Sequence, residues 1–179
     1  MKMKYLGILF LISSIVLISH TSKSSIMSNR VGDVKKDSFG TKLNKIIDGI
    51  QNDFMDIRGA KKEGEYIETY DSKVNLPGAE FGMIYGQFEK TPWTYICHFN
   101  SEKDKAIAGL NFEKLRGLLS KNLGDKYTAV PQTPDDKLIN GILFASNNPI
   151  GSKIPGIFLE ESFDYGSYRV QISFYGLSE

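Results

Sequence analysis

Residues 93–99 read WTYICHF, and the alternation within this stretch decides the fold class. Side chains of a β-strand point alternately to opposite faces of the sheet. The two sets of alternate positions are Trp93, Tyr95, Cys97 and Phe99 on one side and Thr94, Ile96 and His98 on the other. We therefore expect a strand whose first face packs against helices and whose second face is mixed in polarity.

Five further segments have the same two-residue period and predict strands. They are Glu65–Ser72, Glu80–Phe88, Leu138–Ala145, Gly156–Phe163 and Tyr168–Tyr175. Turn-forming residues at 75–78 and 89–92 separate the three strands between residues 65 and 99, and such short connections favour antiparallel neighbours. The stretch 127–134 is punctuated by prolines, and we expect no regular element there.

Two segments have the three- and four-residue spacing of an amphipathic helix. The apolar residues of the first are Phe39, Leu43, Ile46, Ile47, Ile50 and Phe54, with Ser38 or Thr41 as a cap and Gly59 as the stop. Those of the second are Ala106, Ile107, Leu110, Leu115, Leu118, Leu119 and Leu123, with Gly124 as the stop. Gly109 and Asn111 interrupt the second stripe, which favours a kink or a restart of that helix.

Together these elements predict an α+β fold, a two-layer domain in which two main helices lie on one face of a twisted antiparallel sheet. The two halves of the chain share a plan of one helix followed by three strands. Leu76-Pro77-Gly78 and Ile154-Pro155-Gly156 precede corresponding strands of the two halves. A diverged duplication explains this pattern, and so does coincidence, because proline and glycine open many strands.

The N-terminus has the features of an export signal. Lys2 and Lys4 precede an apolar run over Tyr5–Ile18, and small polar residues follow it. The run is shorter than the ~20 apolar residues of a membrane-spanning helix, so cleavage is favoured over an uncleaved anchor. We predict a signal peptide at 1–24, cut after Thr21 or Ser24, a flexible linker at 25–37 and a single domain at 38–179, located in the periplasm or outside the cell.

Loss of the signal changes the charge and the chemistry of the chain. The basic residues fall from 22 to 19 against 21 acidic ones, so the formal charge moves from +1 to −2. A nearly neutral chain lacks the basic surface that nucleic acid or anionic lipid requires, and we expect contact with a membrane only through the signal. Cys97 is the single cysteine of the sequence, which excludes an intramolecular disulfide.

Chemistry-bearing motifs are scarce in the predicted domain, and we expect no catalytic, cofactor-binding or metal-binding site. Cys97 and His98 are adjacent in a strand, so they point to opposite faces and cannot form a nucleophile and base pair. Gly151-Ser152-Lys153 lacks the earlier glycine and the following helix of a phosphate-binding loop. Of the acidic residues, Glu160 and Glu161 are interpreted as one outward and one edge residue.

The mixed face of the sheet is the one surface that we connect with function. It is predicted to present Ile67, Thr69, Ile84, Ile96, His98, Phe158 and Tyr175. An uncovered sheet rich in such side chains is a recurrent protein-binding surface, although an ordinary solvated face has scattered apolar residues as well. An error of one residue in the register would move each side chain to the core.

Ile50, Phe54, Ile57-Arg58-Gly59 and the segment Lys73–Ala79 (KVNLPGA) resemble small, uncharacterised exported α+β proteins of Gram-negative bacteria. The likeness covers about the first half of the domain. In outline, the plan is also similar to envelope and secreted inhibitor modules that present a sheet to a partner. Such likeness at the level of the fold transfers no catalytic or binding residue.

Three functions follow as hypotheses. The first is a non-enzymatic protein-interaction module, exported, whose partner is an envelope or extracellular protein. The second is a small-ligand or lipid-binding domain with a pocket between helices and sheet, lined by Phe81, Tyr85, Tyr95 and Phe99. The third is a carboxylate-dependent hydrolase, for which Glu68, between Tyr66 and Tyr70, is the first acid to inspect.

Overall fold

The computed structural model describes residues 36–63, 67–86, 92–99, 101–149 and 155–176. The predicted signal peptide at 1–24 lies outside the described residues, as does nearly all of the predicted linker. The first described helix, α2, spans Lys36–Gly49 and therefore begins before Ser38, the predicted start of the domain.

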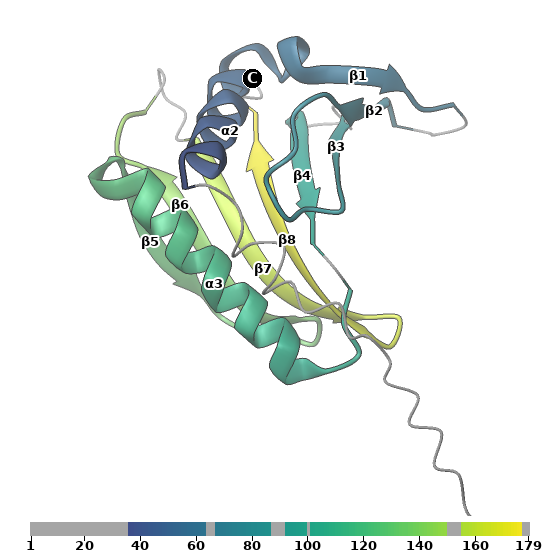
Figure 1. Ribbon diagram of the computed structural model, residues 1–179, viewed down its shortest axis with the longest axis vertical. Coiled ribbons are helices and arrows are strands. Elements are labelled where there is room, and N and C mark those ends of the chain that lie inside the picture. Colours follow the sequence, from purple (N-terminus) through teal and green to yellow (C-terminus); the bar gives the residue numbers. More distant parts are fainter. Residues whose placement is uncertain (1–35, 64–66, 87–91, 100, 150–154, 177–179) are drawn as a thin grey trace, which may run out of the picture.

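Eight strands form one antiparallel sheet in the order β1-β2-β3-β4-β8-β7-β6-β5 (Figure 1). The strands are β1 (Arg58–Lys61), β2 (Thr69–Ser72), β3 (Phe81–Tyr85), β4 (Thr94–His98), β5 (Tyr127–Gln132), β6 (Leu138–Ser146), β7 (Gly156–Asp164) and β8 (Ser167–Tyr175). The predicted α+β class and the antiparallel sheet are confirmed. The pairing of β4 with β8 joins the first and second halves of the chain in the middle of the sheet.

Helix α3 spans Lys105–Leu123, close to its predicted bounds. The side chain of Asp104 caps its start by accepting hydrogen bonds from the backbone amides of Ala106 and Ile107. The predicted interruption is wrong, because the helix runs through Gly109 and Asn111 without a break. Asn111 is buried on the inner side of the helix instead of capping a new one.

The first helix is shorter than predicted from the sequence. Helix α2 stops at Gly49 and is followed by two short 3₁₀ turns, η1 (Ile50–Asn52) and η2 (Met55–Ile57). Between them, Asp53 and Phe54 both have positive φ angles, of 55° and 62°. The chain turns there because the Phe54 amide donates to the Gly49 carbonyl at 2.7 Å, which returns the Phe54 side chain to the core.

Two edge strands were not predicted from the sequence. Strand β1 begins at Arg58, so Gly59 lies in a strand and does not stop a helix. Strand β5 contains Pro131 in the stretch for which no element was expected. A proline has no backbone N–H to donate, and it fits β5 because this strand has a neighbour on one side only.

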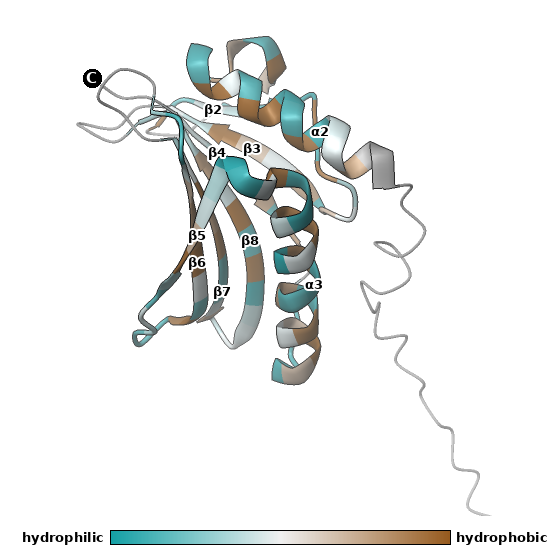
Figure 2. Cartoon of the chain, turned by 90° about the vertical axis from the view of Figure 1, so that its left-hand side faces the viewer, coloured by the Kyte–Doolittle hydropathy of each residue, from teal (hydrophilic) through white to brown (hydrophobic). Residues whose placement is uncertain are grey.

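One apolar core joins both helices to the sheet. It contains Leu43 and Ile46 from α2, Leu115 and Leu119 from α3, and alternate residues of the strands. Helix α3 contacts β7 and β8 (Figure 2). The strand residues in this core are Ile84, Tyr95, Cys97, Ile142, Phe144, Ile157, Leu159, Val170, Ile172 and Phe174. The residues between them in each strand point to the other face of the sheet, which we call the outer face.

Candidate functional site

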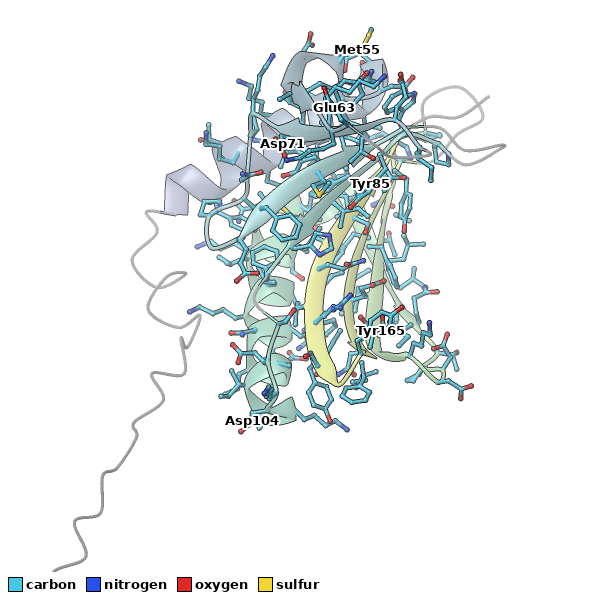
Figure 3. The ribbon with its side chains drawn as sticks, turned by 90° about the vertical axis from the view of Figure 1, so that its right-hand side faces the viewer. Met55, Glu63, Asp71, Tyr85, Asp104 and Tyr165 are labelled. Carbon is cyan, nitrogen blue, oxygen red and sulfur yellow. The ribbon has the colours of Figure 1, made fainter. Side chains whose placement is uncertain are left out.

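The outer face is organised in rows, because residues paired across antiparallel strands share one face. A central row crosses seven strands from β2 to β5 and consists of Asp71, Met83, Ile96, Ser173, Phe158, Leu143 and Val130. Five of these seven side chains are apolar, and the charged one, Asp71, lies at the β2 end of the row. Figure 3 shows α3 to the left of β8 and labels Tyr85, which lies one row away from Met83.

Two rows flank the central row. The upper row consists of Thr69, Tyr85, Thr94 and Tyr175. The lower row consists of Phe81, His98, Gln171, Glu160, Gly141 and Gln132. The outer face therefore has an apolar centre with aromatic and hydroxyl groups on one side and titratable groups on the other.

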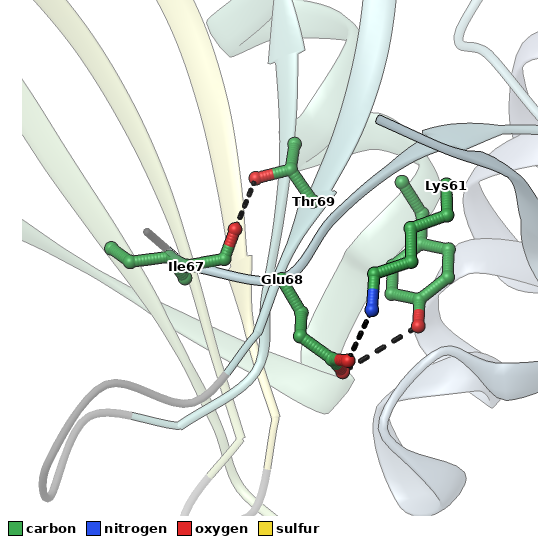
Figure 4. A network of polar contacts seen from close by, with 5 residues as sticks. Lys61, Ile67, Glu68 and Thr69 are labelled. Atoms are coloured by element: carbon green, nitrogen blue, oxygen red, sulfur yellow. Dashed lines mark hydrogen bonds and ion pairs between the residues drawn. The ribbon is translucent and has the colours of Figure 1, made fainter. Parts of the chain in front are cut away.

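Four of the predicted face residues lie on the outer face and are half-buried. They are Ile96, His98, Phe158 and Tyr175. Ile67 is also half-buried and lies just before β2, where its carbonyl accepts a hydrogen bond from the Thr69 hydroxyl at 3.1 Å (Figure 4). For the four strand residues the placement agrees with the prediction, whereas Ile67 lies outside the paired residues of β2, which alone are assigned to a face. The part of all five residues in binding remains a prediction.

The other two predicted face residues are not accessible. Ile84 pairs with Tyr95 and is completely buried in the core, so its assignment to the outer face is wrong. The error is the one-residue register shift described above, and Met83 and Tyr85 take the place of Ile84. Thr69 does share the row of Tyr85, but it is only 1% exposed and offers no surface to a partner.

The most exposed apolar residues of this face were not among those predicted from the sequence to lie on it. Phe81 and Val130 are 43% and 42% exposed. Phe81 lies against His98, with ring centroids 4.6 Å apart. Phe81 was not predicted because its position depends on the register of β3 and β4, in which Ile84 lies opposite Tyr95 and Phe81 beside His98. Val130 was not predicted because the stretch around Pro131 does not alternate as an isolated strand.

Two hollows lie at the lower side of the outer face and share Arg169. The first, of about 300 Å³, is beside the β5–β6 connection, and its lining includes Asp135, Lys137, Leu138, Glu160, Arg169 and Gln171. The second, of about 280 Å³, is lined by Glu80, Phe81, His98, Phe99, Ser101 and Arg169. Charged side chains are thus gathered at the lower side of the outer face.

The pKa values of two titratable groups in the lower row, Glu160 and His98, are shifted in opposite directions. Burial raises the pKa of Glu160, and the nearby carboxylate of Asp135 adds to the shift. Burial lowers the pKa of His98, and the positive charge of Arg169 adds to that shift. Gln171 separates the two groups in the row, so their backbones are about 10 Å apart, which is two strand spacings.

Glu68 does not have the properties of a general acid. Its carboxylate pairs with Lys61 at 2.6 Å, and the hydroxyl of Tyr70 is 3.5 Å away (Figure 4). The hydrogen bond and the charge of Lys61 lower the pKa of Glu68, whereas a catalytic acid needs a raised one. Tyr66, which was expected to flank it, lies outside the described residues.

Cys97 and His98 point to opposite faces, as predicted. Cys97 is buried in the core, where its sulfur lies 3.0 Å from the Tyr95 hydroxyl, and burial raises the pKa of its thiol to about 11. Within the described ranges, no three histidine, cysteine or acidic side chains are grouped so that they could hold a metal ion.

The predicted ligand pocket does not form from its four aromatic residues. Tyr95 and Phe99 are buried in the core, whereas Phe81 and Tyr85 belong to rows of the outer face. The sheet itself separates the two pairs. The interpretation of Glu161 as an outward or edge residue is also wrong, because Glu161 is 1% exposed and lies on the inner face.

Comparison of the chain with protein-family models, with curated proteins and with solved structures gives no match. None of the helices in the described ranges has the length and apolar character of a membrane-spanning segment.

Proposed function

We propose that this protein is an exported, non-enzymatic interaction module that binds a protein partner through the outer face of its sheet. The observation that carries the proposal is the central row, in which Met83, Ile96, Phe158, Leu143 and Val130 form an apolar band across the sheet. Export rests on the signal-like N-terminus and on the resemblance to exported proteins, and both remain predictions.

We propose that both helices cover the inner face and leave the outer face available. The support is that the buried residues of α2 and α3 belong to one core with the inner residues of the strands. A partner would meet a rigid surface, since the side chains of the central row stand on hydrogen-bonded strands. Interfaces combine an apolar centre with a polar rim, and the rows of the outer face have this order.

A duplication also agrees with the strand order. Each half consists of one helix followed by four antiparallel strands, and the order β1-β2-β3-β4-β8-β7-β6-β5 is symmetric about the β4–β8 pair. The repeated unit that we propose is therefore one strand longer than the three-strand unit suggested by the sequence. Pro77-Gly78 and Pro155-Gly156 occupy corresponding places, before β3 and at the start of β7.

Cross-linking of two charged variants to partners tests the proposed surface. Ile96→Lys places a charge in the central row, and Leu110→Lys places the same charge on α3, where Leu110 is 69% exposed. We expect Ile96→Lys to abolish cross-linking of envelope proteins to the full chain in cells, and Leu110→Lys to leave it unchanged. Equal cross-linking by both variants, with unchanged melting temperatures, would refute the proposal.

A second candidate function is binding of a small polar ligand. A hollow of about 380 Å³ lies between the helices and the sheet, and its lining includes Asn44, Asp48, Asn122, Lys126, Tyr127 and Asn148. The polar lining favours a hydrophilic ligand over a lipid. A thermal-shift screen of polar metabolites against the full chain and an Asn44→Leu variant tests it, since a true ligand would stabilise only the unaltered hollow.

A further inference from the structure

Glu160 is a half-buried carboxylate in the lower row of the outer face. Its neighbours in that row are Gln171 on β8 and Gly141 on β6, and neither has a charge. No ion pair or hydrogen bond joins the Glu160 side chain to another residue in the described part of the chain. Removing a carboxylate from water is unfavourable unless a cation or a donor compensates it.

Of the two cations of the first hollow, Arg169 is engaged with another acid. Arg169 pairs with Asp164 at 3.8 Å. The charge of Lys137 acts on Asp135, whose pKa is lowered mainly by backbone hydrogen bonds from Leu138 and Lys137. The charged group that does act on Glu160 is Asp135, which has the same sign. The lining contains three acids, Asp135, Glu160 and Asp164, and two cations, Lys137 and Arg169, so the hollow has a formal charge of −1, and Glu160 is the acid of this lining that lies in the lower row.

The surroundings of Glu160 restrict what could supply the compensating charge. The volume of about 300 Å³ is at the lower end of the range of ~300–1,000 Å³ for small-molecule pockets, so one side chain fits better than a cofactor. Leu138 provides apolar lining, and Phe158 is the next outer-face residue of β7. A Cβ atom on Gly141 would lie 3.1 Å from both, so the absence of a side chain there lets these two groups gather beside Glu160.

We infer that the first hollow receives an arginine side chain of the protein partner, with its guanidinium beside Glu160 and its methylene groups over Leu138 and Phe158. This inference rests on the proposed function and specifies the chemistry of the partner. A planar guanidinium offers two parallel donors to a carboxylate, and its stem packs on apolar surface. The apolar residues next to this arginine in the partner would contact the central row.

Nuclear magnetic resonance titration of the ¹⁵N-labelled full chain with N-acetyl-arginine-N-methylamide tests the hollow without a known partner. We expect saturable shifts of the amides of 135–138, 160–162 and 169–171. The citrulline analogue, which has the same shape and no charge, should bind at least about tenfold more weakly, as loss of a charged hydrogen bond implies. Equal shifts with both compounds, or none with arginine, would overturn the inference.

Glu160→Gln keeps the size of the side chain and should weaken the binding of the arginine compound by about tenfold. Glu113→Gln, on α3, is the matched control and should leave it unchanged. Retained spectra of both variants would show that the fold is intact. If Glu160→Gln binds the compound as the original chain does, the arginine site is refuted.

Cross-linking in cells separates this inference from the proposed function. If Ile96→Lys abolishes cross-linking to the partner and Glu160→Gln does not weaken it, the outer face binds a partner but the arginine site is wrong. If neither variant changes cross-linking, both proposals fail. Loss with Ile96→Lys together with at least a threefold loss with Glu160→Gln supports both.

Discussion

The side-chain amide of Asn140 donates a hydrogen bond to Oε2 of Glu161 at 2.6 Å, between paired positions of β6 and β7. Glu161 is 1% exposed, and its other carboxylate oxygen has no hydrogen-bond partner in the described part of the chain. Among the residues that the structure describes, the bond from Asn140 is therefore the only hydrogen bond to this buried carboxylate. Removing this hydrogen bond tests whether Glu161 is buried on the inner face.

Asn140→Ala should destabilise the protein by about 1–3 kcal/mol, because Glu161 is left buried without its donor. Urea unfolding followed by circular dichroism measures the change. Asn148→Ala is the matched control, since Asn148 is exposed, and a change within about 0.5 kcal/mol is expected there. Equal stability of the two variants would mean that Glu161 has another partner.

Glu160→Gln should make the protein more stable at neutral pH. Burial raises the pKa of Glu160 in the folded state, so the folded protein binds this proton more tightly than the unfolded chain. Stability is therefore lost as the pH rises through the unfolded pKa of about 4.3 towards the folded one, and glutamine escapes that loss. Urea unfolding midpoints of the variant and of the original chain, measured at pH values from about 3.5 to about 8 so that they span this pKa, should diverge as the pH rises. Coinciding midpoints for the variant and the original chain would contradict the burial of Glu160.

Cys97 should be inert to thiol reagents in the folded protein. Its sulfur is completely buried, and a pKa of about 11 leaves little thiolate at neutral pH. Labelling with a chromogenic disulfide should proceed only as fast as the protein opens, and completely in urea. A Leu110→Cys variant provides the comparison, because that position is exposed on α3 and should react at once. Rapid labelling of Cys97 would contradict the assigned register of β4.

Two glycine-to-alanine substitutions should have opposite effects on stability. At Gly59, a Cβ atom would lie 2.8 Å from the backbone carbonyl of Asp71, so Gly59→Ala should cost about 1–3 kcal/mol through a shift of β1. At Gly117, in α3, a Cβ atom meets nothing within 4 Å. Gly117→Ala should stabilise the protein by about 0.5–1 kcal/mol, because alanine is the better helix former. Thermal unfolding of the two variants measures both, and stabilisation by Gly59→Ala would contradict the pairing of β1 with β2.

The features that were not predicted correctly, strand β5 and the face of Ile84, depend on contacts between segments and not on the local sequence pattern. Strand β5 was not predicted because Pro131 disfavours a strand everywhere except at the edge of a sheet. Whether a segment lies at an edge is decided only when the sheet assembles. Ile84 was placed on the wrong face for a related reason. Two alternating strands can be aligned in two ways, and the choice depends on the partner strand, here on Ile84 opposite Tyr95.

By itself, the sequence determined the elements with strong local periodicity. These are α3, the strands β6, β7 and β8, and the division of WTYICHF into an inner face with Cys97 and an outer face with His98. Each follows from the geometry of a single segment, in which side chains repeat every two or every 3.6 residues. The tertiary structure alone decided which segments lie side by side. The β4–β8 pair joins residues far apart in the chain, and it brings His98, Gln171 and Glu160 into one row. No local period encodes such a row, because it arises from contacts among strands whose order is set by packing of the whole domain.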